Sequence, residues 1–149
     1  MDFIFGDAKA FFENCEIRAA AHSTAMLTAQ SKHYPGQESG YVFEHCKITA
    51  DPGAQHIFLG RPWRPYFTVV FLDTDMEASI EPAGWREWHP GETHSLETAY
   101  YAEFNSSGPG ADPEHRDPHA KSLAADDALR FSLETFLSGP DGWNPSVAP

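Results

Sequence analysis

An aspartate and an arginine stand in two segments whose composition suits them for chemistry. Asp2 lies in an apolar run, residues 2–6 (DFIFG), and Arg61 lies between glycine and proline in residues 59–63 (LGRPW). An arginine fork that grips a carboxylate keeps it ionised and oriented. Such a carboxylate can act as a nucleophile or clamp a carbohydrate. The two segments therefore predict a site built on an Asp2–Arg61 pair, although an ordinary structural ion pair is the alternative.

Composition narrows the class of protein. The chain has 149 residues, of which 41% are hydrophobic and 21% charged, as in one soluble globular domain. Its net charge of -12 argues against nucleic acid as a partner, because phosphates need a basic surface. A neutral or partly neutralised polymer is easier to accommodate than a strongly anionic one. No apolar run is long enough to span a membrane, and no signal-peptide pattern is visible.

A sequence repeat predicts the fold. Residues 12–17 (FENCEI) recur as residues 43–48 (FEHCKI), and a weaker copy follows at residues 71–76 (FLDTDM). The copies show partial strand-like alternation, and a repeat too short to bury its own apolar face stacks into a solenoid. We therefore expect a parallel β-helix, with a further strand at residues 100–104; an antiparallel sandwich is the alternative. The expected stacks are Phe12 with Phe43 and Phe71, Cys15 with Cys46 and Thr74, and Ile17 with Ile48 and Met76.

The cysteines bear on the details of this solenoid. Strict alternation would place Phe12 and Cys15 on opposite faces, so a bend or bulge is needed between them. Two cysteines are too few for a disulfide framework. We interpret Cys15 and Cys46 as an internal ladder of small apolar side chains, with a disulfide between them as the alternative.

The pattern changes after Gly108. We expect rungs of a β-helix over residues 1–107. A loop, a short helix and a tail packed on the solenoid are expected over residues 108–149. Ser122 is predicted to cap a helix that runs as far as Phe131.

The motifs resemble those of the pectin methylesterases (pectinesterases, carbohydrate esterase family 8). Residues 2–8 (DFIFGDA) and 59–63 match two family motifs, and three shorter segments follow the family order: 27–30 (LTAQ), 82–85 (PAGW) and 107–111 (SGPGA). Residues 41–118 resemble the bacterial branch. The resemblance implies a right-handed parallel β-helix, here truncated at its N-terminal end. It also implies hydrolysis of galacturonate methyl esters in pectin, with release of methanol and no metal or organic cofactor.

The resemblance also assigns roles to side chains. Asp2 matches the nucleophile, and Arg61 matches the arginine beside it. Trp63 and Phe5 match aromatic residues that line the sugar groove, although Phe5 could equally pack in the core. Arg86 and Trp88 are expected in a loop beside the groove, in contact with more distant sugars; that prediction rests on their composition and position.

Three further candidates are weaker. Gln30 could face the groove or satisfy a turn, and Asp7 fits a surface hydrogen bond better than a second acid. Glu87, His89 and His94 lack the spacing of a helical metal-binding motif, so no metal site is expected.

The family mechanism needs a second aspartate and glutamine donors, which lie upstream of the nucleophile motif. Nothing in this chain maps onto them. We therefore expect the C-terminal part of a pectin methylesterase, weakly active or inactive alone, and monomeric when complete. Its location would be extracellular or periplasmic, where pectin is found. The alternatives are a non-catalytic carbohydrate-binding β-helix and a related β-helix esterase with a different acyl substrate.

Overall fold

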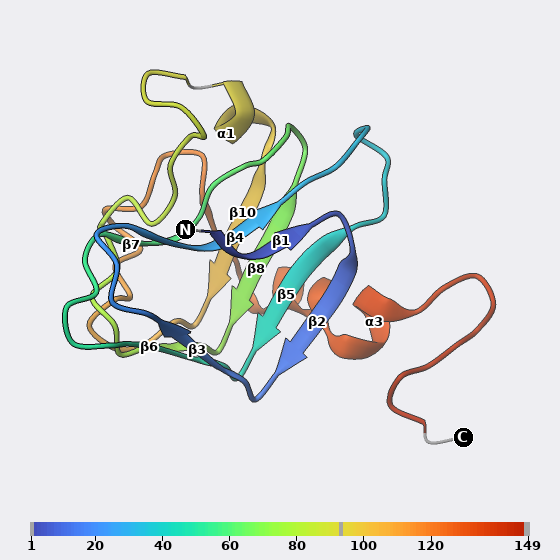
Figure 1. Cartoon of the computed structure of the whole chain (residues 1–149). Helices are drawn as coiled ribbons and strands as arrows, with labels where there is room; N and C mark the ends of the chain where they lie inside the picture. Colours follow the sequence, from blue (N-terminus) through green and yellow to red (C-terminus); the bar gives the residue numbers. More distant parts are fainter. Residues whose placement is uncertain (1, 93, 148–149) are drawn as a thin grey trace.

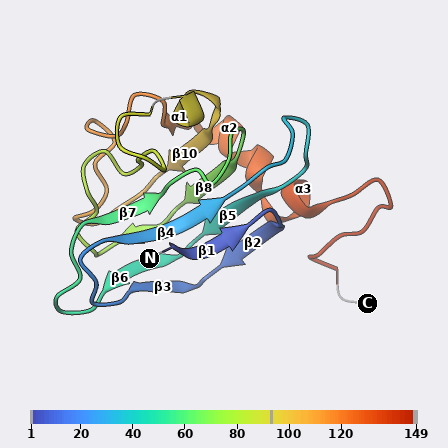
Figure 2. The same ribbon diagram turned by 45° about the horizontal axis from the view of Figure 1, so that its top comes forward.

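The computed structural model describes residues 2–92 and 94–147. Their strands form three parallel sheets, which the chain visits in a fixed order before it starts the next turn (Figures 1 and 2). The first sheet holds β1 (Asp2–Gly6), β4 (Ala25–Gln30) and β7 (Ile57–Gly60). The second holds β2 (Lys9–Glu13), β5 (Gly40–Glu44), β8 (Thr68–Leu72), β10 (Tyr100–Phe104) and β11 (Lys121–Ser122), in that order across the sheet. The third holds β3 (Glu16–Ala19), β6 (Lys47–Ala50) and β9 (Asp75–Met76). This is a parallel β-helix, as the repeat predicts.

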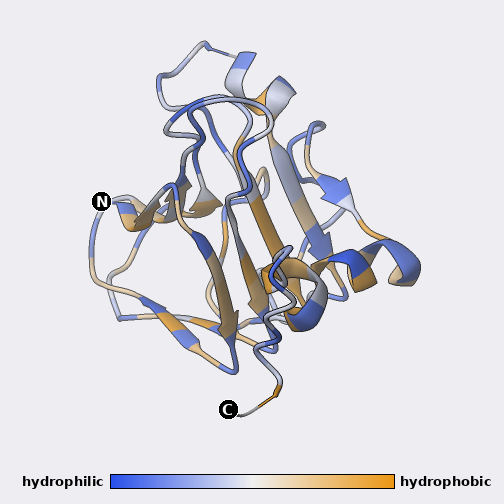
Figure 3. Ribbon diagram, turned by 90° about the vertical axis from the view of Figure 1, so that its right-hand side faces the viewer, coloured by the Kyte–Doolittle hydropathy of each residue, from blue (hydrophilic) through white to orange (hydrophobic). Residues whose placement is uncertain are grey.

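Ladders of like side chains form the core of the solenoid. Phe12, Phe43 and Phe71 are register partners, and their rings stack with centroids 4.6 Å and 4.7 Å apart. A second ladder joins Ile17 to Ile48, and Ile48 to Met76. Both predicted stacks are confirmed. Apolar residues run along these strands, whereas the loops are mainly hydrophilic (Figure 3). Each turn thus buries an apolar face that it could not bury alone.

The predicted bend recurs at the same corner of successive turns. Asn14, His45, Asp73 and Asn105 all have a positive φ, of 54°, 51°, 45° and 52°. Asn, Asp and His tolerate this left-handed conformation better than most residues. The corner lets Phe12 and the cysteine that follows both face inward, which strict alternation would not allow.

Cys15 and Cys46 are both free thiols. Cys46 is buried, and its thiol donates to the carbonyl oxygens of Phe12 and Glu44 at 3.4 Å. Burial raises the pKa of the Cys46 thiol, which disfavours the reactive thiolate.

We expect iodoacetamide to label Cys15, which is partly exposed, and to spare Cys46 until the protein is unfolded. Peptide mass spectrometry after timed labelling at neutral pH measures both rates. Equal labelling of the two thiols in the native protein would contradict the buried ladder.

The C-terminal segment corrects one prediction. Ser122 does not cap a helix, because it lies in β11, which pairs with β10. The helical residues form α2 (Ala125–Ala128), a 3-10 turn (Leu129–Phe131) and α3 (Leu133–Leu137). The cap of α3 is Ser132, whose hydroxyl accepts from the Thr135 backbone N–H at 3.3 Å. These short helices cover the outer face of the second sheet, where Phe131 and Phe136 pack beside Val42 and Val70.

The tail after α3 extends away from the solenoid (Figure 1), and its Trp143 side chain is exposed. The expected packing of the tail on the solenoid is therefore not seen in the described part of this segment. Among the residues that the structure describes, no helix is long and apolar enough to cross a membrane.

One arginine pairs with a buried carboxylate at the C-terminal end of the phenylalanine ladder. Glu103 is the register partner of Phe71 in β10, so its carboxylate follows the phenylalanine stack. Arg116 donates to this carboxylate from Nε at 2.7 Å, and to the Gly110 carbonyl oxygen from Nη2 at 2.7 Å. Only 4% of the Arg116 side chain and 10% of the Glu103 side chain are exposed. The phenylalanine ladder thus ends at a buried, hydrogen-bonded ion pair.

Candidate active site

The predicted Asp2–Arg61 pair forms on the first sheet. β1 pairs with β4 and β4 pairs with β7, so the start of β1 and the residue after β7 meet across β4. Arg61 donates from Nε to Oδ1 of Asp2 and from Nη2 to Oδ2, both at 2.8 Å. The two side chains are 21% and 22% exposed. This bidentate fork fixes the plane of the carboxylate, while one side of it stays accessible.

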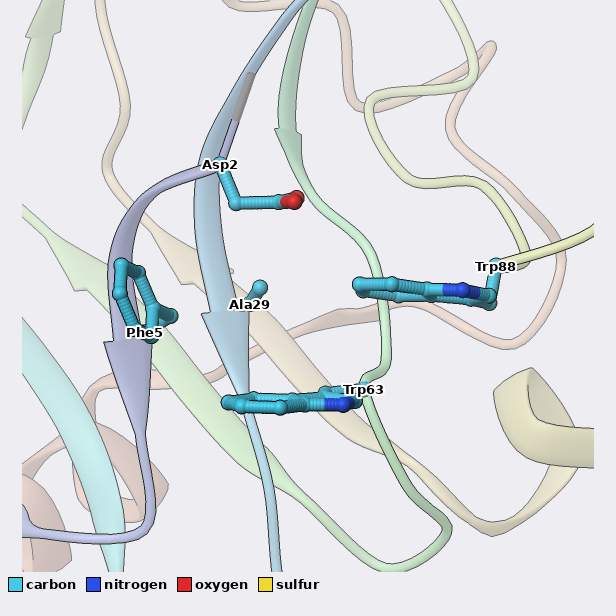
Figure 4. Close-up of a pocket in the computed structure, with 5 residues that line it drawn as sticks. All are labelled: Asp2, Phe5, Ala29, Trp63 and Trp88. Atoms are coloured by element: carbon cyan, nitrogen blue, oxygen red, sulfur yellow. The ribbon is translucent and has the colours of Figure 1, made fainter.

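Aromatic side chains surround the carboxylate. Asp2, Phe5, Ala29, Trp63 and Trp88 line a cavity of about 200 Å³. In Figure 4 the Asp2 carboxylate points toward the space bordered by the two indoles, and Phe5 stands on the other side of Ala29. The Trp63 and Trp88 rings are nearly parallel, at 15°, with centroids 6.4 Å apart. Flat apolar walls beside one charged group suit a sugar ring that carries a polar substituent.

Phe5 and Trp63 belong to the cavity surface and not to the core. Phe5 is 62% exposed and Trp63 is 45% exposed. They touch each other edge to face, with centroids 5.9 Å apart. Core packing, the alternative for Phe5, is therefore wrong. Ala29 is the register partner of Phe5, and its small side chain leaves room for the cavity; sequence reasoning did not single it out.

The segment after β9 separates two residues that the sequence grouped together. Trp88 lies in the Asp2 cavity, with its ring 3.8 Å from the Arg61 guanidinium carbon, and therefore sits beside the central pair. Arg86 lines a different cavity with Glu87 and Leu96, and its guanidinium lies over Phe58. The structure thus brings together Asp2, Arg61, Phe5, Trp63 and Trp88, and it places Arg86 elsewhere.

Gln30 and Asp7 have structural partners. Gln30 is fully buried; its side chain donates to the Ser31 carbonyl oxygen and the Ser39 hydroxyl and accepts from the Thr68 backbone N–H. It faces neither groove nor solvent and ties adjacent turns together. Asp7 forms a surface pair with His33 at 3.1 Å. Among the described residues there is no group of three or more His, Cys, Asp or Glu side chains that could hold a metal ion.

Gly60 sets the position of Arg61. A Cβ at Gly60 would lie 2.9 Å from the Thr28 carbonyl oxygen and even closer to its hydroxyl. The Thr28 carbonyl also accepts from the Arg61 backbone N–H at 3.0 Å. Only glycine therefore lets β7 approach β4 closely enough to hold Arg61 in place.

Gly60→Ala is expected to destabilise the protein by about 1–3 kcal/mol, because overpacking forces a backbone shift. Urea unfolding measures the cost. Gly36→Ala is the matched control, because the nearest atom to a Cβ there is 4.0 Å away. Equal stability of the two variants would contradict the tight contact.

Comparison with known proteins shows the family of this chain. The family model for pectinesterases matches residues 1–140. A protein of Arabidopsis thaliana, "Probable pectinesterase/pectinesterase inhibitor 17", is 38% identical over all of this chain, which covers 31% of that protein. The solved pectin methylesterase from carrot is 29% identical and superposes with a TM-score of 0.81, over 89% of this chain and 45% of that one. The chain therefore belongs to the pectinesterase family.

The comparisons confirm the predicted fold class but not the predicted bacterial branch. The right-handed parallel β-helix is confirmed as the fold class by the match with the carrot enzyme and with PemA from Erwinia chrysanthemi, at a TM-score of 0.72. The bacterial detail is not confirmed, because the Erwinia protein is only 23% identical and the carrot enzyme is 29% identical. The chain spans about a third of the length of the curated relatives that it matches.

Proposed function

We propose that this protein acts on the methyl esters of galacturonate residues in pectin, with Asp2 as the nucleophile. One Asp2 carboxylate oxygen attacks the ester carbonyl carbon and forms a tetrahedral intermediate. Collapse of the intermediate breaks the bond to the methoxy oxygen, which leaves as methanol after gaining a proton, and an acyl-Asp2 anhydride remains. Water then hydrolyses the anhydride, which yields a galacturonate carboxylic acid and restores Asp2.

The observation that carries this proposal is the bidentate Asp2–Arg61 pair inside an aromatic cavity. Arg61 holds the carboxylate through two hydrogen bonds and aims it, so the attacking oxygen needs little reorganisation. Trp63 and Phe5 are proposed to contact the faces of the sugar rings. A methylated polymer carries less negative charge than its product, which suits a protein with a net charge of -12.

The departing methoxy oxygen needs a proton. Among the described residues that line the cavity, Asp2 is the only ionisable one, and as nucleophile it cannot also act as the acid. Loss of a general acid typically lowers a rate by about 10²–10⁴-fold. Loss of an oxyanion donor lowers it by about 10²–10³-fold more. We propose that turnover by this cavity alone is slow, and that groups from outside it complete the site.

The same observation also fits a second function. A groove with one carboxylate and aromatic walls could bind a methylated polygalacturonate without hydrolysing it. On either proposal the protein acts outside the cytoplasm, where pectin is found.

Three parallel assays separate these functions: methanol release from highly methylated pectin, hydrolysis of p-nitrophenyl acetate, and retention on immobilised pectin. The proposal expects slow methanol release above the protein-free rate. Retention without any methanol supports the binding function instead. Hydrolysis of the acetate with no methanol from pectin indicates a different acyl substrate.

A further inference from the structure

The indole of Trp88 lies against Arg61, the cation that pairs with Asp2 in the proposed site. Its ring centroid is 3.8 Å from Cζ of Arg61, within the distance at which an aromatic face attracts a guanidinium. The N–H groups at the edge of that guanidinium donate two hydrogen bonds to Asp2. Arg61 is therefore held from two directions, by a carboxylate in its plane and by an aromatic ring against its face.

The loop that carries Trp88 is anchored by two buried residues that precede it. Trp85 is buried and stacks on Tyr101, with centroids 3.7 Å apart. Glu87, the residue before Trp88, is also buried, and its Oε1 accepts from the backbone N–H groups of Ser95 and Leu96 at 2.9 Å and 2.8 Å. Those donors belong to α1 (His94–Thr98). Trp88 thus projects from a backbone that is fixed immediately before it.

The two tryptophans of the cavity differ in what they offer a sugar. Trp63 is 45% exposed, and no cation lies over its ring among the described residues. Trp88 is half-buried, and the guanidinium covers one face of its ring. Trp63 is therefore the better platform for a sugar, and the contacts of Trp88 are first of all with the protein.

We propose that Trp88 is a positioning residue, which holds the Arg61 guanidinium by a cation–π contact in the orientation in which it grips Asp2. This inference rests on the proposed function for its catalytic meaning, because Arg61 matters there as the partner of the nucleophile. Its structural content does not depend on activity.

NMR of the Arg61 side chain tests the structural content directly. A guanidinium over an indole face feels the ring current, and its Nε–H exchanges slowly while it is stacked and hydrogen-bonded. Trp88→Leu is expected to shift the Arg61 Nε–H resonance downfield and to speed its exchange with water. Trp88→Phe, which keeps an aromatic face, should retain part of both effects.

Phe58→Leu is the matched control, because it removes the aromatic partner of Arg86 and not that of Arg61. It should shift the Arg86 resonance and leave the Arg61 resonance in place. Circular dichroism verifies that each variant is folded. An unchanged Arg61 resonance in folded Trp88→Leu would overturn the proposal.

The kinetics of Trp88→Leu then test whether this contact contributes to catalysis. Trp88→Leu is expected to lower kcat for methanol release by about 2- to 30-fold, the range of one cation–π contact, with a smaller change in KM. A raised KM with unchanged kcat would overturn the positioning role in favour of a sugar contact. If the wild-type protein releases no methanol, the proposed function fails, and the NMR result still decides whether Trp88 holds Arg61.

Discussion

Replacing Asp2 with asparagine is expected to lower the rate of methanol release from methylated pectin by about 10³-fold or more, down to the protein-free rate. Asparagine keeps the size of the side chain and can still accept a hydrogen bond from Arg61. It lacks the negative charge and the nucleophilic oxygen that form the acyl intermediate. The loss should therefore appear in kcat, while binding to pectin persists.

Asp7→Asn is the control for this variant. Asp7 follows the same strand as Asp2, but its carboxylate faces His33 on the surface and does not line the cavity. We expect it to keep the wild-type rate. If Asp2→Asn and Asp7→Asn released methanol equally fast, Asp2 would not be the nucleophile.

The second large effect concerns stability and lies far from the cavity. Arg116→Met is expected to lower the free energy of unfolding by about 3–5 kcal/mol, because it leaves the Glu103 carboxylate buried without its cation. The carbonyl oxygen of Gly110 would lose its partner as well. Gly84 shows how closely the arginine fits, since a Cβ there would lie 2.7 Å from Cδ of Arg116. Urea unfolding followed by circular dichroism measures the loss.

An exposed ion pair serves as the comparison. Arg18 contacts Asp51 at 2.6 Å, but the two side chains are 61% and 35% exposed. Arg18→Met should therefore lower the free energy of unfolding far less than Arg116→Met does, because water already screens the exposed pair. The double variant Glu103→Met with Arg116→Met should recover much of the loss, because no unpaired charge remains buried. An equal loss of unfolding free energy in Arg116→Met and Arg18→Met would show that the buried pair stabilises the protein no more than an exposed one.

The repeat in the sequence was enough to predict the solenoid and its internal register. Phe12, Phe43 and Phe71 occupy equivalent positions in successive turns, and a parallel stack in register is the arrangement that buries all three. The Asp2–Arg61 pair was also predictable, because each residue lies in a motif that fixes its place on the first sheet. Periodic strands carry this information because each position has the same neighbours in every turn.

The irregular segments could not be predicted in the same way. Arg86 and Trp88 lie two residues apart, yet the loop turns one toward Phe58 and the other toward Arg61. No period or turn motif encodes that path. At Ser122, pairing of β11 with β10 prevailed over the local tendency of serine to cap a helix. One clue was available for Arg116: alternation places Glu103 on the same inward side as Tyr101, and a buried carboxylate requires a partner.

The proposed mechanism requires the ester to acylate the Asp2 carboxylate. The most direct test gives the protein the methyl and ethyl esters of the same oligogalacturonate, with hydroxylamine present, and measures the ratio of hydroxamate to free acid. Rates with Asp2→Asn, run in parallel, are subtracted as the uncatalysed background. A common acyl-Asp2 intermediate predicts the same ratio for both esters, because the alcohol has left before water and hydroxylamine compete. The test works even for slow turnover, since it measures a ratio and not a rate. A ratio that depends on the alcohol would contradict the acyl-enzyme and the role of Asp2 as nucleophile.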